Sequence, residues 1–217
     1  MSIQPPSLAF CVSLICVLSP ATACMAEGLD EQKIPLRVLV AALTHADEEV
    51  ATSAAMVLAH RGPAAEQAVP ALIAALKDPR RNVRWTAAHA LGSMGASAKG
   101  AVEPLVVCLK DAHWNVRAVA ARSLASIDGK SETAMAALAK ALDDTSRDVR
   151  WSAAFALGKM TVNNDAVISA LTARLGDEDQ QVRRQAQVIL EKIRPLRSSE
   201  KPGVDDDIIL RSVPLAG

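Results

Sequence analysis

The chain has 217 residues, and half of them are apolar, which is enough to bury a core. The apolar residues are mainly Ala, Leu and Val, with no Tyr and only two Phe, a composition that favours closely packed helices. The 24 basic and 24 acidic residues cancel and alternate along the chain. This balance argues against a nucleic-acid-binding protein, because that class carries a basic face or stripe.

The N-terminal segment has the pattern of an export signal. The first 26 residues carry no charged side chain, and an apolar stretch from Leu8 to Leu18 precedes Ser19-Pro20 and the small residues Ala21–Ala23. This order is typical of a secretory signal peptide over residues 1–23, although no Lys or Arg precedes the apolar stretch. The stretch is too short to span a bilayer. The alternative is a disordered N-terminus without a signal.

Cys24 follows the small residues directly, in an arrangement that resembles a bacterial lipoprotein cleavage site with Ala21 in place of the usual Leu. Cys24 is therefore a candidate for lipidation. We expect an exported protein, periplasmic or extracellular, that a lipid on Cys24 would anchor to a membrane without any span. After cleavage only Cys108 would remain beside Cys24, and Cys108 is expected to be a small buried residue, so no disulfide framework is implied.

The segment from about residue 34 to 194 is a fivefold repeat. Five rows of apolar residues recur every 33 residues without an insertion or deletion. Such a period indicates a solenoid, in which each unit buries its apolar face against its neighbours. The expected units are about 34–67, 68–100, 101–133, 134–166 and 167–194. The rows are Leu39, Leu72, Leu105, Leu138 and Leu171; Leu43, Leu76, Leu109, Leu142 and Leu175; Val50, Val83, Val116, Val149 and Val182; Ala54, Ala87, Ala120, Ala153 and Ala186; and Leu58, Leu91, Leu124, Leu157 and Leu190.

Each unit contains two helical patterns. In the second unit, Leu72 and Leu76 share one face of a first helix, and the row from Val83 to Leu91 shares one face of a second. The turn between them begins with Asp78-Pro79. Gly92 and Gly95 are expected to loosen the end of the second helix. The chain is thus predicted to be all-α, a right-handed superhelix of five helix pairs.

The repeat text also resembles a known family. Three successive units read LIAALKDPRRNVRWTAAHALGSMG, LVVCLKDAHWNVRAVAARSLASID and LAKALDDTSRDVRWSAAFALGKM. These units resemble the short HEAT-like repeats of the phycocyanobilin-lyase type, which implies an armadillo/HEAT-like solenoid. Ankyrin repeats have a similar period, but their Thr-Pro-Leu-His-like start and Gly-rich hairpin are missing. The copies around Val50 and Val182 depart from the pattern and are expected to be caps. Residues 195–217 are expected to form a mobile tail, or else a further cap.

Two ladders of charge accompany the repeat. The acidic ladder is Asp78, Asp111, Asp144 and Asp177, and the basic ladder is Arg84, Arg117, Arg150 and Arg183. One interpretation is a stripe of Arg side chains that binds an anion. The other is a structural role, in which each Arg pairs with an Asp of its own or the adjacent unit. Because regular Asp–Arg alternation neutralises itself, the structural interpretation is favoured.

The aromatic residues do not follow the repeat. On a helical wheel of the second helix, Val83, Ala87 and Leu91 point one way, whereas Trp85 and His89 point the opposite way. The outer side of second helices commonly lines the concave surface of such solenoids. We therefore expect a partner-binding patch on that surface, since Trp and Arg are frequent in interface hot spots. The alternative is that the rings only stiffen the stack. The patch would contain Trp85, His89, Trp114, Arg122, Trp151, Phe155 and Lys159.

Signs of catalysis are few. The four His residues occupy four different repeat positions, so no metal centre is predicted. The His-Glu dyads of the related deoxyhypusine hydroxylases do not occur, and no cofactor motif is found. We therefore predict a non-catalytic scaffold that binds another protein, without nucleic acid or a cofactor. Two alternatives remain open: a lyase-like or tetrapyrrole-handling protein, which rests on the resemblance alone, and a repeat protein that self-assembles through its end units.

Overall fold

A computed structural model describes residues 33–160 and 164–198, with side chains up to Ile193. The proposed signal peptide 1–23, Cys24 and the tail beyond residue 198 lie outside the described residues. Every regular element between these limits is a helix. In chain order they are α2 (Leu36–Ala42), α3 (Glu48–Arg61), η3 (Gly62–Ala68), α4 (Val69–Ala75), α5 (Arg81–Met94), η4 (Gly95–Ala101), α6 (Val102–Cys108), α7 (Trp114–Ile127), α8 (Glu132–Ala141), α9 (Arg147–Lys159), α10 (Asp165–Ala173), η5 (Arg174–Gly176) and α11 (Gln180–Ser198).

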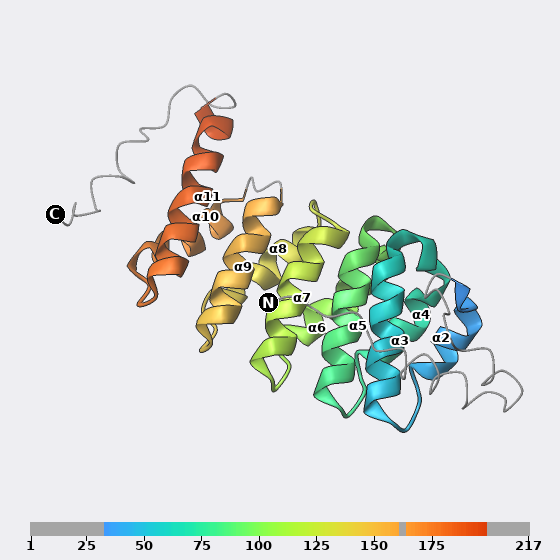
Figure 1. Ribbon diagram of the computed structural model, residues 1–217. Helices are drawn as coiled ribbons and strands as arrows, with labels where there is room; N and C mark the ends of the chain where they lie inside the picture. The colour runs from blue at the N-terminus through green and yellow to red at the C-terminus, as the bar shows by residue number, and fades with distance from the viewer. Residues whose placement is uncertain (1–32, 161–163, 199–217) are drawn as a thin grey trace, which may run out of the picture.

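The helices form two layers. Figure 1 shows α3, α5, α7, α9 and α11 side by side in chain order, each packed against the next, and we call them the second-helix layer. The helices α2, α4, α6, α8 and α10 lie behind them and form the first-helix layer. The prediction of an all-α solenoid built from helix pairs is confirmed. No helix within the described residues is both long and apolar enough to cross a membrane.

The five apolar rows form the core between the layers. Leu72, Val83, Ala87 and Leu91 have no exposed surface, and their equivalents in the other units are nearly all buried. The Ala row lies between neighbouring second helices, where a small side chain allows two helices to approach closely. The exceptions are Leu175 and Leu190, which are half-buried. Both belong to the last unit, on which no further helix pair packs within the described residues.

Glycines of the second helices allow close packing. A Cβ at Gly92 would lie 2.5 Å from Ser123 Oγ, and one at Gly158 would lie 2.8 Å from Ile189 Cγ1. Gly92 therefore lies in the last turn of α5 as a contact point with α7, a role that was not expected from the sequence. Gly95 does end α5, and its φ of 57° is in the left-handed region that favours glycine.

The turns between the two helices of each unit share one hydrogen bond. The side chain that begins each turn accepts the backbone N–H two residues further on: His45 Nδ1 does so in the first unit and an Asp in the other four, as Asp78 does from Arg80 and Asp144 from Ser146. This local bond favours a turn over continued helix, which explains why the first helices are short. At the C-terminal end, α11 continues through Pro195 to Ser198, past the expected boundary of the repeats at residue 194.

Candidate functional site

The two ladders meet along the ridge formed by these turns, which we call the turn ridge. Arg84 donates from Nε to Asp111 Oδ2 at 2.7 Å and from Nη2 to Asp111 Oδ1 at 3.1 Å. Arg117 makes the same two-pronged pair with Asp144, at 2.7 and 2.8 Å. Each pair joins one unit to the next. Of the two pairings considered from the sequence, the structure has the one between adjacent units.

The same Arg side chains also bind their own turns. Nη1 of Arg84 donates to the carbonyl oxygens of Asp78 and Pro79, at 2.8 and 2.9 Å. Arg117 and Arg150 repeat this arrangement in the following turns. Each guanidinium therefore hydrogen-bonds to its own turn and forms an ion pair with the next unit. Few donors remain for an external anion, so this geometry favours the structural role.

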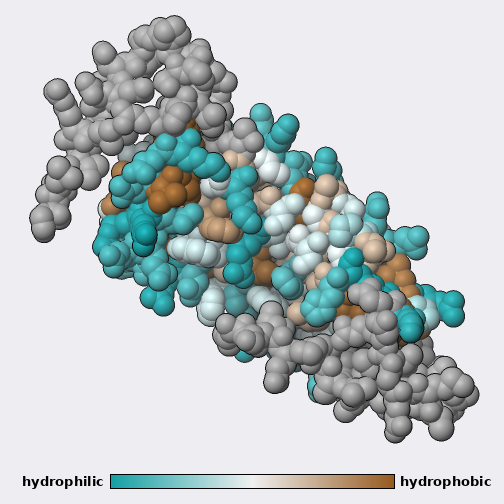
Figure 2. Space-filling model, turned by 45° about the horizontal axis from the view of Figure 1, so that its top comes forward, coloured by the Kyte–Doolittle hydropathy of each residue, from teal (hydrophilic) through white to brown (hydrophobic). Residues whose placement is uncertain are grey.

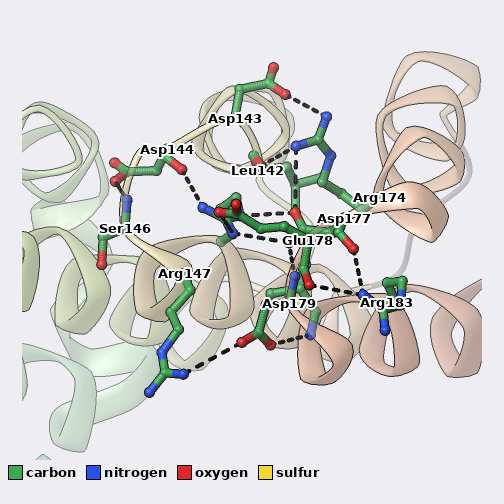
Figure 3. Close-up of polar contacts among 12 residues, drawn as sticks. Leu142, Asp143, Asp144, Ser146, Arg147, Arg174, Asp177, Glu178, Asp179 and Arg183 are labelled. Atoms are coloured by element: carbon green, nitrogen blue, oxygen red, sulfur yellow. Dashed lines mark hydrogen bonds and ion pairs between the residues drawn. The ribbon is translucent and has the colours of Figure 1, made fainter.

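The last complete pair is the most buried. Arg150 donates to Asp177 at 2.9 and 3.0 Å, and their side chains are only 6% and 2% exposed. Arg150 also reaches Glu178 at 3.0 Å. Figure 3 shows this cluster, in which Arg174 bridges Asp143 and the carbonyl oxygen of Leu142. A cavity of ≈ 330 Å³ borders the same residues, but its charged walls are already paired with one another.

The pairing keeps the ladder carboxylates ionised. Burial alone would raise the pKa of Asp111, but hydrogen bonds from Arg84 and from the backbone N–H of His113, together with the charge of Arg84, outweigh it. The pKa of Asp111 therefore lies below its usual value, and the pKa values of Asp144 and Asp177 are lowered in the same way. The pKa values of Arg84, Arg117 and Arg150 are raised in return, chiefly by these hydrogen bonds.

The first junction lacks the regular pair, because Ala51 stands in the Arg position and His45 in the Asp position of the first unit. Arg80 takes over this function. It pairs with Asp78 at 2.8 Å and donates from Nη1 to the carbonyl oxygens of His45 and Ala46, at 2.9 and 3.0 Å. Sequence reasoning missed Arg80 because it lies outside the repeated positions.

The outward side of the second-helix layer holds the predicted patch. Trp85 and His89 stack on α5 with ring centroids 5.6 Å apart and an interplanar angle of 21°. Both rings are half-buried, and Trp85 packs against the core. The pKa of His89 is lowered by burial first, and then by the positive charges of Arg122 and His60. His89 is therefore an uncharged ring near neutral pH.

A second stack lies on α9. Trp151 and Phe155 are 5.2 Å apart with an interplanar angle of 13°, and the Nζ of Lys159 lies 4.8 Å from the centroid of the Phe155 ring. This cation–π contact holds the Lys159 ammonium over the stack. Trp85 and Trp151 occupy equivalent positions in α5 and α9, two units apart, so both stacks face the same way.

Helix α7, which lies between the two stacks, carries two exposed residues of the predicted patch. Trp114 begins α7 and is 52% exposed, and Arg122 lies about two turns further along the same side of α7. Trp114 stacks on no other aromatic ring in the described part of the chain. The structure thus places all seven predicted residues on one side of the second-helix layer, in two stacks flanking an open helix. We call this side the second-helix face.

Sequence reasoning missed four basic residues of this face. Arg81, Arg147, Arg184 and Lys192 are all exposed, and each occupies a repeat position equivalent to that of a predicted patch residue. Alignment of all five units would have found them. Figure 2 shows one side of the molecule, on which teal hydrophilic areas separate paler and brown apolar ones.

Other chemistry is sparse within residues 33–160 and 164–198. No group of three or more His, Cys, Asp or Glu side chains there could hold a metal ion. Cys108 is buried, as expected, and burial is the main cause that raises the pKa of its thiol to about 11. A thiol that stays protonated is a poor nucleophile.

Comparison with known proteins identifies the family and the fold. The sequence matches the model for HEAT repeats over residues 36–106 and 102–191. An engineered protein is 29% identical, with 87% of each chain covered and a TM-score of 0.59. A designed armadillo repeat protein in complex with peptide (KR)4 is 23% identical over 86% of this chain and 99% of that chain, with a TM-score of 0.64.

The complex of CpcE and CpcF of phycocyanin lyase from Nostoc sp. PCC7120 is also similar in structure. It is 20% identical over 71% of this chain and 96% of that chain, with a TM-score of 0.57. No curated protein matches the sequence at a significant level. Because the family model spans most of the residues and the structure is a stack of helix pairs, the chain belongs to the HEAT-repeat family.

Proposed function

We propose that the protein is a non-catalytic scaffold that binds another protein through its second-helix face. One observation carries this proposal: every aromatic residue of the described chain lies on a second helix and outside the repeated core rows. The fully buried core is built from aliphatic and Met side chains, mainly Ala, Leu and Val, and contains no fully buried aromatic ring among the described residues. Large rings at positions that vary from unit to unit therefore point to recognition, and Trp and Arg are common interface anchors.

The comparisons support a protein as the partner. One structure of similar fold is a designed repeat protein in complex with a peptide, and another is a complex of two proteins. At 23% and 20% identity these similarities concern the fold, so they support the architecture as a protein-binding surface and carry no catalytic role over to this chain. We therefore prefer the scaffold to a lyase-like function.

We further propose that the scaffold acts outside the cytoplasm. The uncharged apolar stretch before Ala21–Ala23 supports export, and Cys24 supports a lipid anchor. Mass spectrometry of the mature N-terminus tests both points. A chain that begins at Cys24 with added acyl mass supports the anchor, whereas an intact Met1 would overturn export.

The test of binding is capture of cross-linked partners from native extract by the full mature chain. Trp114→Ala is the informative variant, because Trp114 is exposed and its truncation should leave the fold intact. Trp85, Trp151 and Phe155 are less suitable alone, since at least Trp85 also supports the core. We expect Trp114→Ala combined with Phe155→Ala to lose the partners that the wild type captures.

The matched control is Val107→Ala. Val107 is 71% exposed but lies on α6 in the first-helix layer, so its truncation removes apolar surface from the other layer. Circular dichroism must show that all variants remain helical. Equal capture by the wild type, the double variant and Val107→Ala would refute the second-helix face as the binding surface.

A further inference from the structure

We propose that the segment bound by the second-helix face is an acidic, extended stretch of the partner protein. This inference rests on the proposed function and specifies the chemistry of its partner. Positive charge is concentrated in the last four helices of the second-helix layer, although the whole chain has a net charge of zero and α3 contains two Glu and one Arg. From α5 to Ile193 in α11, the second helices contain ten Lys or Arg residues and two acidic residues, Asp148 and Glu191.

Three of the ten are neutralised in the ladder, by Asp111, Asp144 and Asp177. These carboxylates lie in the turns. Among the described side chains of α5, α7, α9 and α11, only Asp148 and Glu191 are acidic. The paired Arg residues of the ladder are thus neutralised by Asp residues of the turns, and the basic residues outside the ladder make the second-helix face positive. The basic residues exposed on that face are Arg81, Arg122, Arg147, Lys159, Arg184 and Lys192.

Most of these residues lack an acidic partner. No carboxylate of the described residues lies within ion-pair distance of Arg81, Arg122 or Arg184. Lys159 contacts a ring and Lys192 donates to the carbonyl oxygen of Gly158 at 3.0 Å, so the contacts of both are with uncharged groups. Arg147 has only distant partners, Asp179 at 3.6 Å and Asp148 at 3.9 Å, and is 70% exposed.

The spacing of these charges suits an extended chain. Neighbouring packed helices are about 8–10 Å apart, and each of α5, α7, α9 and α11 contributes one or two of the six basic residues. A peptide in the extended polyproline II conformation advances about 3.1 Å per residue with three residues per turn, so every third side chain lies on the same side, about 9 Å from the last. A segment with a carboxylate at every third position can therefore meet one basic residue per unit. The apolar residues between them would contact the rings of Trp114 and Phe155.

The rings favour a peptide over single-stranded nucleic acid. Base stacking requires an open ring face, and the two stacks on α5 and α9 already cover ring faces with His89 and Phe155. Trp114 is the only exposed Trp or Phe of the described chain. The sequence pI of about 6.9 is also far from the basic values of nucleic-acid-binding domains.

The test is fluorescence anisotropy of the full chain with a labelled twelve-residue peptide that has Asp at every third position and Leu and Ala between. The same peptide with Lys in place of Asp is the peptide control. The variant Arg81→Glu, Arg122→Glu, Arg184→Glu reverses the charge of the face. The matched control variant, Lys77→Glu, Lys110→Glu, Lys140→Glu, makes the same change in net charge at exposed positions in the turns and first-helix layer.

We expect the wild type and the control variant to bind the Asp peptide equally, and the face variant to bind it at least tenfold more weakly. Binding should weaken as salt rises from about 50 to 500 mM, because exposed charges are screened. Equal loss in both triple variants would contradict the proposal, since it would reflect net charge alone. Tighter binding of the Lys peptide, or of a labelled twelve-nucleotide single strand, would also overturn it.

Failure of this inference can be told apart from failure of the proposed function. If Trp114→Ala combined with Phe155→Ala loses the captured partners while the charge-reversed face variant keeps them, the face binds a partner that is not acidic. If neither variant loses partners, the second-helix face itself is the wrong surface. Retention by the Trp114 and Phe155 variant with loss by the charge-reversed variant would support an acidic partner that does not use the rings.

Discussion

The turn ridge and the second-helix face use the same residue types for opposite purposes. On the turn ridge, Arg84, Arg117 and Arg150 repeat every 33 residues, and each is held by a carboxylate and by turn carbonyls. On the second-helix face, Arg81, Arg122 and Arg184 occupy positions that vary between units and have no carboxylate partner among the described residues. In this solenoid, regularly repeated charge therefore serves stacking, whereas irregularly placed charge is available for recognition.

The largest expected effect comes from breaking the most buried pair of the turn ridge. Arg150→Ala leaves the Asp177 carboxylate buried without its partner, which should lower the free energy of unfolding by about 3–5 kcal/mol. Urea denaturation followed by circular dichroism measures this. Arg147→Ala, one turn away and 70% exposed, is the control and should change stability by less than about 1 kcal/mol. Similar losses in the two variants would contradict the structural role of the ladder.

The second prediction concerns the contact between second helices. Gly158→Ala places a methyl group against Ile189, and Gly92→Ala places one against Ser123. Overpacking of this kind should lower the free energy of unfolding by about 1–3 kcal/mol, despite the higher helix propensity of Ala. Gly100→Ala is the control, because nothing lies within 4 Å of its added Cβ. Thermal melts of the three variants would decide, and unchanged melting at Gly92 and Gly158 would refute the close approach.

The third prediction is a loss of stability in acid. The folded-state pKa values of Asp111, Asp144 and Asp177 lie below the unfolded value of about 3.9. The stabilisation is therefore fully present above about pH 5 and disappears as the pH falls through the lowered folded values. Urea midpoints measured between about pH 6 and pH 2 should fall in the acid range, and Asp144→Asn should make the curve flatter. An unchanged curve would show that the pair does not depress the pKa of Asp144.

The sequence predicted the turn ridge better than the second-helix face. The apolar rows and the two ladders repeat in register, so the helix pairs, the core and Asp–Arg pairing could be anticipated from spacing. The structure was needed to show that each pair joins adjacent units. Arg80 could not be anticipated. It replaces the missing pair at the first junction by donating to the carbonyl oxygens of His45 and Ala46, which lie 35 and 34 residues before it in the chain. The close contact of Gly92 with Ser123 depends on how near α5 and α7 lie to each other, and the sequence of one helix does not show that distance.

The second-helix face was only partly predictable. Trp85 and Trp151 were recognised because aromatic residues are rare in this chain, whereas Arg81 and Arg184 were missed because Arg is common in it. Each ring stack joins two residues that are four positions apart on one helix. This spacing is visible in the sequence, as in Trp85 and His89. The concentration of positive charge became visible only after the structure assigned the ladder carboxylates to the turn ridge.

The substitution expected to change stability least is on the second-helix face. Trp114→Ala should change the free energy of unfolding by no more than about 0.5 kcal/mol, as for an ordinary surface position. The same change should weaken partner binding by about 2 kcal/mol, the usual loss at an aromatic hot spot. Denaturation and binding measured on one preparation give both values. A large loss of stability would instead make Trp114 part of the packing.

The most direct test of the division between the two surfaces is lysine footprinting of the full chain with and without a captured partner. Lys159 and Lys192 lie on the second-helix face, whereas Lys77, Lys110 and Lys140 lie in the turns and first-helix layer, and all five are exposed. We predict that the partner reduces acetylation of Lys159 and Lys192 and leaves the other three unchanged. Protection of Lys77, Lys110 and Lys140, with Lys159 and Lys192 still reactive, would contradict the account.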